Sequence, residues 1–536
     1  MDSTAGDRRR KLLTLAVLAF GVANAALYSS LLPLWEGFDE AFHYGYVQDV
    51  AVSRSLPVLG RASLSDEVWT SLRLVPVSFI VRRSHPSLTT FDEFFALPPA
   101  EQAKRRDQLD HLSPALRASH SDTPKNYEVH QAPAAYALLA LGDGLWAHTV
   151  LPARVWLLRL AASMLCCLAV AAAALYLARG LGWRRMDEPA LLFLVFCTQM
   201  FYATVCHVAN DWLAVPLAVG LLGAAVRFYR APGSNSGWML AGTLALGLLT
   251  KAYFLAFVPG VFALVVWRAW GRPQMTLLLA PLLSGAWYVR NILQYGSLTG
   301  MVESVNGVGV RAVVAALPRI PWLPTIGYMA RGSLWTGNNT FSTFSRTTLD
   351  LMLLLVLAGI VLVVARLNPA ERIVLAGIAL FILALVYATA QEYVFRKGTS
   401  AGASVWYTQP LLVPVLGLVL AGFARAGRGG KWLRFAMLLL WAYVICATYW
   451  VKLIPLYAGH GENANMAHLF DWYLRAAPPG QGILSRLSLV TLLPAGVICG
   501  LAGLVTAAAL VICGFVVGGA GQELRNEANS AANVRM

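Results

Sequence analysis

The sequence predicts an all-α polytopic membrane protein. Its 536 residues are 58% apolar and only 13% charged, whereas soluble domains carry about 25% charged residues. Its apolar runs recur at lengths near those that a helix needs to cross a hydrocarbon core about 30 Å thick. These runs are continuous rather than alternating, which excludes a transmembrane β-barrel.

The formal charge of +15 comes largely from short basic loops between the apolar runs. An excess of Lys and Arg in short loops marks the cytoplasmic side of a membrane protein, so the charge does not indicate binding to nucleic acid. The seven cysteines lie in or beside apolar runs without the spacing of metal ligands. We therefore expect them to be small buried hydrophobes.

The first apolar run, Leu12–Leu34, predicts the first span. The basic segment Arg8–Lys11 precedes it, which predicts a cytoplasmic N-terminus. The run is too long for a signal peptide, and no small-residue cleavage site follows it, so we expect it to be retained. Residues 1–34 are thus interpreted as a cytoplasmic tail and the first transmembrane helix.

Residues 35–151 predict a long first extracytoplasmic loop with interfacial helices. Polar segments of this length are usually functional rather than passive connections. Near its end, Ala132–Val150 is moderately apolar but contains Pro133, Asp143 and two glycines. We interpret it as an interfacial or re-entrant helix, because a further span here would place the basic loop that begins at Arg179 outside.

Eleven further apolar runs predict about twelve spans in all. Their approximate bounds are 153–178, 189–206, 211–229, 237–250, 252–268, 274–290, 349–366, 371–390, 405–424, 433–452 and 487–516. Residues 152–290 would hold the core helices, 291–348 a second extracytoplasmic loop, and 349–536 the C-terminal helices and a cytoplasmic tail. This arrangement places every strongly basic short loop inside. The loops contain Arg179, Arg184 and Arg185; Arg227 and Arg230; Arg268 and Arg272; Arg366 and Arg372; and Arg425, Arg428, Lys431 and Arg434.

Lys251 divides the apolar stretch Trp238–Trp270 into two expected spans. A single helix through this stretch would bury the lysine at the middle of the bilayer, at a cost of several kcal/mol. Two short spans place Lys251 at an outer turn instead, and the basic loops on both flanks favour this hairpin.

The predicted topology gathers the unusual polar residues at the outer face. A charged group close to lipid is a functional candidate. Because both negative and positive side chains are present, they suggest an acid/base group beside an anion-binding group. The residues are Asp39, Glu40, His43, His130, Gln131, His207, Asn210, Asp211, Lys251, Arg290 and Asn291.

Asp39 is the preferred catalytic carboxylate, with Glu40 and His43 as supporting candidates. Asp39 and His43 are four residues apart, so on a helix they share a face, and a carboxylate hydrogen-bonded to an imidazole can act as an oriented base. The alternative is that Asp39 only caps the helix that begins at Glu40. The neighbouring Glu40 and the long following loop favour a functional role.

The remaining candidates are four polar residues in two loops and two cations. His130 and Gln131 close the first loop, and Asn210 and Asp211 lie in a tight turn; structural hydrogen bonding or helix capping is the alternative for each. Lys251 and Arg290 are cations set against the membrane, where simple snorkelling is the alternative. A lipid phosphate suits both, because lysine supplies a point charge and arginine a bidentate fork.

Five motifs in order resemble the GT-C superfamily of integral-membrane glycosyltransferases. The chain looks most like its bacterial branch of protein mannosyltransferases, aminoarabinose transferases and galacturonosyltransferases. The motifs are Phe38–His43 with Tyr46, Glu128–Pro133 with Tyr136, Asn210-Asp211 with Leu213-Ala214, Leu249–Lys251, and Trp287–Asn291 with Tyr295-Gly296. A looser sixth is Ser333–Trp335 with Phe341. The sequence departs from some relatives at Ala132-Pro133 and at Val405–Tyr407.

This resemblance implies a polyprenyl-phosphate sugar as donor and transfer at the outer, periplasmic face of the bacterial cytoplasmic membrane. It implies that Asp39 activates or positions the acceptor hydroxyl, with Glu40 and His43 beside it, and that Lys251 and Arg290 face the donor phosphate. His130, Gln131, Asn210 and Asp211 are then candidates for substrate binding. The sugar remains open, and so does the acceptor, which can be a lipid-linked glycan, a cell-wall polymer or a protein. A divalent metal also remains open, because no clear ligand set stands out.

A multi-pass transporter or lipid flippase is the alternative from another class. About twelve helices and charges at the outer face are compatible with it. Transporters usually carry polar or broken helices at mid-membrane and paired internal repeats, and the sequence displays neither. An inactive homologue that acts as a partner subunit is a third possibility.

Overall fold

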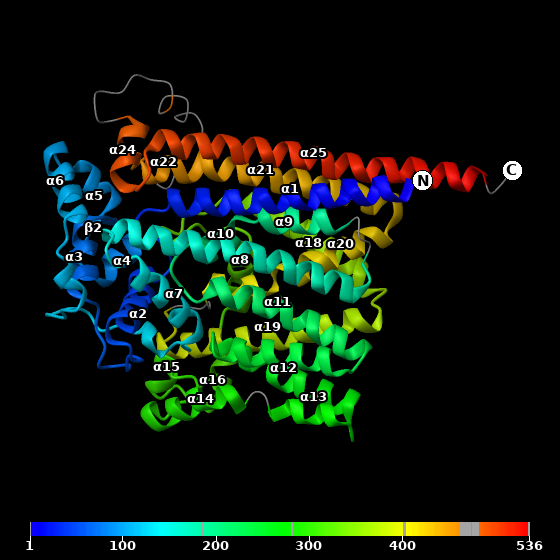
Figure 1. Ribbon diagram of the computed structural model, residues 1–536, viewed down its shortest axis with the longest axis horizontal. Helices are drawn as coiled ribbons and strands as arrows, with labels where there is room; N and C mark the ends of the chain where they lie inside the picture. The colour runs from blue at the N-terminus through cyan, green and yellow to red at the C-terminus, as the bar shows by residue number, and fades with distance from the viewer. Residues whose placement is uncertain are drawn as a thin grey trace.

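The computed structural model describes residues 2–183, 187–279, 282–399, 404–460, 473 and 482–533. Within these residues the protein is a bundle of long helices with a smaller helical head at one end (Figure 1). The head comes from the first predicted loop. It contains α2 Glu40–Ser53, α3 Asp66–Leu74, β1 Pro76–Val77, α4 Phe79–Ser84, β2 Thr89–Thr90, α5 Phe91–Ala96, α6 Pro99–Asp110, η1 Pro114–Arg117, η2 Glu128–His130 and α7 Ala134–Leu145. Its two short strands pair in parallel.

The first half of the bundle surrounds α8, which packs against α1 and α11. It contains α1 Asp2–Leu31, α8 Leu151–Leu181, α9 Glu188–Cys197, α10 Gln199–Val205, α11 Asp211–Arg230, α12 Ser234–Leu248, η4 Ala252–Phe257, α13 Val258–Ala269, η5 Pro273–Leu279 and α14 Leu282–Tyr295. Figure 1 shows α1, α8 and α11 running side by side, with the head at the opposite end from the N-terminus.

The second half begins with short elements that follow α14, and then returns to long helices. The short elements are α15 Val302–Val305, α16 Val310–Ala316, η6 Leu317–Arg319 and α17 Trp322–Gly332. The later elements are α18 Arg346–Val364, α19 Pro369–Phe395, η7 Val405–Leu411, α20 Leu412–Arg425, α21 Gly427–Ala447, η8 Thr448–Leu453, α22 Ile454–Tyr457, α24 Ile483–Val490 and α25 Ala495–Asn533. The α25 helix packs back against α1 and α21.

The described residues contain nine helices long and apolar enough to cross a membrane, or ten if α9 and α10 form one bent span. An all-α polytopic membrane protein is thereby confirmed, whereas the expected number of about twelve spans is not. The predicted run 237–250 forms α12, whose 15 residues measure only about 22 Å, short of a hydrocarbon core of about 30 Å. The run 274–290 is divided between η5 and α14.

The run 189–206 bends by 66° between α9 and α10. At the bend, the Thr198 hydroxyl donates to the Leu194 carbonyl and accepts from the indole of Trp441. Such back-bonding often bends helices. Transporters also contain broken helices, so the bend itself does not separate the two candidate functions.

Two sequence-based interpretations of short segments are consistent with the helix lengths. The α7 helix lies within the predicted interfacial segment, and its 12 residues measure about 18 Å, too short to span. The expected break at Lys251 is present, since α12 ends at Leu248 and η4 begins at Ala252.

Basic residues of the predicted cytoplasmic loops gather at the end of the bundle opposite the head. Arg10 and Arg179 pair with Glu188 at 2.7 and 3.0 Å. In the same region Arg425 pairs with Glu371 at 2.5 Å. Loops distant in sequence thus share one end, as the charge pattern predicts, although Arg184 and Arg185 lie outside the described residues.

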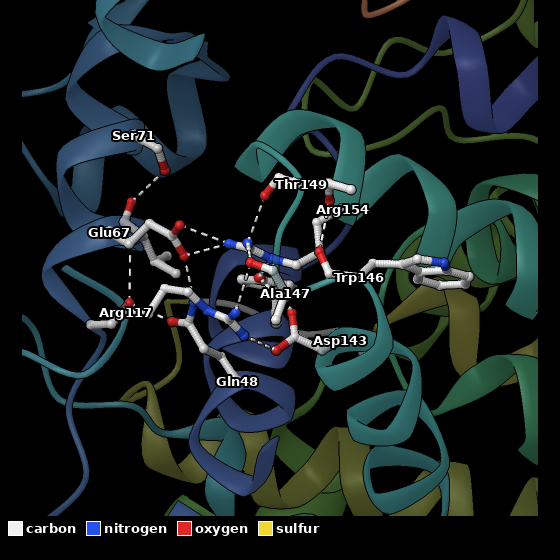
Figure 2. A network of polar contacts seen from close by, with 12 residues as sticks. Gln48, Glu67, Ser71, Arg117, Asp143, Trp146, Ala147, Thr149 and Arg154 are labelled. Carbon is white, nitrogen blue, oxygen red and sulfur yellow. Dashed lines mark hydrogen bonds and ion pairs between the residues drawn. The ribbon is translucent and has the colours of Figure 1, made fainter. Parts of the chain in front are cut away.

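A buried polar network fastens the head to α8 (Figure 2). Arg154 of α8 donates to both carboxylate oxygens of Glu67 at 2.7 Å and lies 3.2 Å from Asp143 of α7. Arg117 of η1 donates to the same Asp143 at 2.5 Å, and Gln48 of α2 donates to Glu67 at 2.5 Å. Four head elements are therefore fixed to one residue of the bundle, which orients α2 and the residue before it, Asp39.

Candidate functional site

Asp39 lies in the turn between α1 and α2 with a left-handed backbone, φ 52°. It occupies the N-cap position, but its side chain makes no capping hydrogen bond. Instead, the Tyr127 hydroxyl donates to its Oδ1 at 2.6 Å. No other described residue bonds this half-buried carboxylate, so the capping interpretation is wrong for the side chain, and its second oxygen is open to a ligand.

Glu40 has a different environment from its neighbour Asp39. Arg159 of α8 binds both Glu40 oxygens at 2.7 and 2.5 Å, and the Val208 backbone N–H donates to Oε1 at 3.0 Å. The Glu40 side chain is fully buried. Its oxygens are occupied by structural partners, so the geometry favours a role in holding the start of α2 in place.

The sequence pattern suggested that His43 pairs with Asp39, but in the structure His43 has other partners. Its Nδ1 lies 2.8 Å from the Tyr136 hydroxyl and 3.5 Å from Glu128 Oε2. Gln131 donates to the same Glu128 oxygen at 3.2 Å. Sequence reasoning overlooked Glu128 as a site residue, although it stands two positions before His130 in a motif already singled out.

Burial raises the pKa of both acidic groups in this cluster. For Asp39, the Tyr127 hydrogen bond and the positive charge of Lys251 oppose the rise in pKa. For Glu128, burial and then the charge of Asp39 raise the pKa to about 8. Glu128 therefore retains a proton near neutral pH, and because the charge of Asp39 raises the pKa of Glu128, the two carboxyls ionise less readily together than apart.

Lys251 and Asp211 form a buried ion pair at the start of α11. Lys251 Nζ donates to both Asp211 oxygens at 2.7 Å. Next to it, the Asn210 amide donates to Gln131 Oε1 at 3.2 Å and to the Thr250 carbonyl at 3.1 Å. Three of the sequence motifs therefore meet here. The lysine has three N–H donors, so its pairing with Asp211 leaves donor capacity for a ligand.

A cavity of about 560 Å³ opens beside this ion pair. Its polar end contains Lys251, His130, Gln131 and Tyr407, and most of its remaining wall is apolar. Burial lowers the pKa of His130 to about 4, so this histidine is neutral at physiological pH. The apolar wall comes from η4, α19 and the segment 296–310 and includes Leu255, Ala256, Leu298, Met301, Val308, Val310, Phe381, Ala384, Leu385 and Ala388. The volume falls within the usual range for small-molecule sites.

Arg290 does not line this cavity. One of its terminal nitrogens donates to the Pro57 carbonyl at 2.9 Å, and its guanidinium lies 4.6 Å from the Trp287 ring. The other terminal nitrogen, Nη1, is buried without a partner. The structure thus brings Lys251 to the cavity, with His130 and Gln131, and leaves Arg290 at the flank.

The described residues contain no group of three or more His, Cys, Asp or Glu side chains arranged to hold a metal ion. The candidate site is therefore described by its carboxylates, its ion pair and its aromatic rings.

The fold and cavity define a polytopic helical membrane protein with a mainly apolar pocket lined at one place by Lys251, His130 and Gln131. No protein-family model matches the chain, and no curated protein sequence matches it. Among solved structures, it is similar to ArnT from Cupriavidus metallidurans bound to undecaprenyl phosphate, with 12% identity over 98% of this chain and 79% of that chain and a TM-score of 0.45. The apo state of that protein gives 13% identity, 88% and 75% coverage, and a TM-score of 0.39.

Both TM-scores are below 0.5, so the likeness carries no functional argument.

Proposed function

We propose that the chain is a membrane glycosyltransferase that moves a sugar from a polyprenyl-phosphate donor to an acceptor hydroxyl at the extracytoplasmic face. The observation that carries this proposal is the cavity, whose apolar wall leads to Lys251 and Tyr407. Such a cavity suits a long hydrocarbon chain with an anionic head. The ordered GT-C-like motifs support the same class of donor.

In this proposal Lys251 binds the donor phosphate, and Asp211 orients the lysine. The ion pair is buried, and in a region of low dielectric an ammonium group stabilises nearby negative charge more strongly than it does in water. The role of Arg290 as a second ligand of the donor phosphate remains a prediction. Its unpartnered Nη1 is available, but its side chain would have to turn towards the cavity.

Asp39 acts as the base in the proposed step. The open oxygen of Asp39 takes the proton of the acceptor hydroxyl as that oxygen forms a bond to the anomeric carbon of the donor. The bond from the anomeric carbon to the phosphate oxygen breaks, and its electron pair leaves with polyprenyl phosphate. Lys251 stabilises the additional negative charge on this leaving group. Tyr127 holds the first oxygen of Asp39 and so directs the second.

The proposed side of the membrane follows from charge. The N-terminal part of α1 and the last turns of α8 and α20 carry Arg10, Arg179 and Arg425. Figure 1 shows the N-terminus at the end of the bundle opposite the head, and Arg10 and Arg179 both pair with Glu188. If that end is cytoplasmic, Asp39 and Lys251 face the outside. Lipid-linked sugars displayed there would supply the donor without a nucleotide-binding domain.

The test uses the full-length protein in liposomes with a panel of synthetic undecaprenyl-phosphate sugars and membrane-extracted acceptors. Release of undecaprenyl phosphate and covalent labelling of the acceptor are measured together. We expect Asp39→Asn to reduce both by about 10²- to 10⁴-fold, the usual contribution of a general base. Asp107→Asn on the exposed head surface is the matched control.

Full activity of the Asp39→Asn protein would refute the assignment of the base. Movement of the lipid-linked sugar across the bilayer with no covalent transfer would instead support the transporter alternative and refute the proposed function.

A further inference from the structure

Four aromatic side chains form a continuous wall beside the candidate site, and we call Phe341, Phe38, Trp406 and Tyr407 the aromatic wall. Phe38 stacks on Trp406 with ring centroids 4.1 Å apart and an interplanar angle of 14°. Phe341 contacts Phe38 at 5.8 Å, and Tyr407 contacts Trp406 edge-on at 5.9 Å. Three segments distant in sequence thus contribute to one aromatic cluster, in which Phe38 is buried and the other three rings are half-buried.

The aromatic wall connects the two chemical groups of the proposed reaction. Phe38, which lies between Phe341 and Trp406, immediately precedes Asp39 in the chain. At one end of the aromatic wall the Tyr407 ring lies 4.8 Å from Lys251 Nζ, and Tyr407 lines the cavity. A donor with its phosphate at Lys251 and its anomeric carbon towards Asp39 would therefore place its sugar ring along Trp406 and Tyr407.

Two polar groups of the aromatic wall lack a protein partner among the described residues. These groups are the indole N–H of Trp406 and the hydroxyl of Tyr407, both on half-buried side chains. Nearby, the hydroxyl of Tyr253 is buried without a partner.

Of these three groups the Tyr253 hydroxyl is buried, and a buried polar atom without a partner costs free energy unless a ligand pairs with it. The three polar groups lie on neighbouring aromatic rings, which suits a ligand that carries hydrogen-bonding groups and also has an apolar surface. A pyranose has both, since its C–H bonds form an apolar face and its hydroxyls project from the rim.

We propose that the aromatic wall binds the transferred sugar and that this sugar is an uncharged pyranose. The proposal rests on the proposed function above. The C–H face of the ring packs on Trp406, and hydroxyls of the sugar pair with the Trp406 indole and the Tyr407 hydroxyl. A uronic acid is disfavoured, because its carboxylate would lie near Asp39, which is ionised as the base of the proposed step, and would be repelled by like charge.

The test measures KM and kcat for undecaprenyl-phosphate donors that carry a neutral hexose, an amino sugar or a uronic acid. Wild-type protein should use the neutral hexose at least tenfold more efficiently than the uronic acid. Trp406→Ala should raise KM for that donor about tenfold, the equivalent of one aromatic contact, with a smaller change in kcat. Trp406→Phe keeps a ring but loses the N–H and should raise KM about threefold.

Trp432→Ala is the matched control, because this tryptophan is 71% exposed near the start of α21. Thermal unfolding in detergent shows whether each variant is folded, and the Phe variant preserves the test if the Ala variant is not. Unchanged KM in both Trp406 variants, or efficient use of the uronic acid by wild type, would overturn the inference while leaving the proposed function intact. Absence of transfer from all three donors would count against the proposed function itself and remove the basis of the inference.

Discussion

Two buried polar clusters of this protein have similar compositions but different arrangements. The first is the network around Arg154, which joins Arg154 and Arg117 to Glu67 and Asp143. The second is the candidate site, which contains Asp39, Glu128, Asp211 and Lys251. The network balances two cations with two carboxylates, whereas the site has one cation for three carboxyls. The first cluster is arranged to be neutral and paired, and the second is arranged to hold a proton and an open carboxylate.

The hydrogen bonds of the carboxylates distinguish the clusters further. In the network, Glu67 and Asp143 accept several hydrogen bonds, and among its charged atoms the Arg117 Nε is buried without a partner. At the site, Asp39 has one protein partner, and a neighbouring hydroxyl on Tyr253 has none. Buried polar groups usually find partners. Each cluster leaves a buried polar atom unpaired, so the difference lies in the carboxylates. Those of the network are paired and hold the head in place, whereas the second oxygen of Asp39 is open to a ligand.

The largest expected effect comes from breaking the network. Arg154→Leu leaves the Glu67 and Asp143 carboxylates buried with fewer partners, which should lower the free energy of unfolding by about 3–5 kcal/mol. Thermal and denaturant unfolding in detergent measure this loss. Arg82→Leu removes a half-exposed ion pair with Glu93 and should cost at most about 1 kcal/mol. Equal stability of the two variants would show that the network does not fasten the head.

The ion pair of the site should behave differently when it is removed. Lys251→Met should reduce transfer by about 10²-fold, in line with the loss of one electrostatic contact to the leaving group, and should also destabilise the protein because Asp211 is left unpaired. Adding Asp211→Asn should recover stability but not transfer. Lys104→Met on the exposed head surface is the control. Recovery of transfer in the double variant would show that the Lys251–Asp211 ion pair stabilises the fold and does not bind the donor phosphate.

The smallest expected effect concerns pH. Glu128 has a pKa raised to about 8, so it is neutral below that pH and ionises above it, adding a negative charge near the donor phosphate. Transfer should therefore fall a few-fold as pH rises through about 8, because like charge opposes the leaving phosphate. Glu128→Gln should remove this alkaline decline. Transfer should still fall at low pH, as the raised pKa of Asp39 is approached and the base takes up a proton.

A parallel pH profile of Glu101→Gln, a half-exposed glutamate of the head, should match that of the wild type. An alkaline decline that persists in Glu128→Gln would assign it to another group.

Sequence reasoning predicted much of the bundle because hydropathy reports apolar length directly. The runs at 153–178, 211–229 and 371–390 correspond to α8, α11 and α19. Charge placement also predicted the break at Lys251. The bend at Thr198 was not foreseen, because a hydropathy window does not register a hydroxyl that bonds to the backbone and to Trp441.

The candidate site was predicted only in part, because the sequence indicates where a residue lies along the chain but not where its side chain points. Proximity to a membrane end identified Asp39, Lys251 and Asp211, but it did not give the direction of each side chain. Glu128 became visible as a partner of His43 only when residues 85 positions apart were brought together. Arg290 shares the expected region yet turns to Pro57, and single-sequence reasoning has no means to predict that rotation.

The most direct measurement of the central claim is photo-crosslinking of the full-length protein in liposomes with a diazirine-labelled polyprenyl phosphate. The account predicts that labelled peptides come from η4, α19 and the segment 296–310, which line the cavity beside Lys251, and that unlabelled undecaprenyl phosphate competes. Competed labelling confined to other helices, with none in these three segments, would contradict the account.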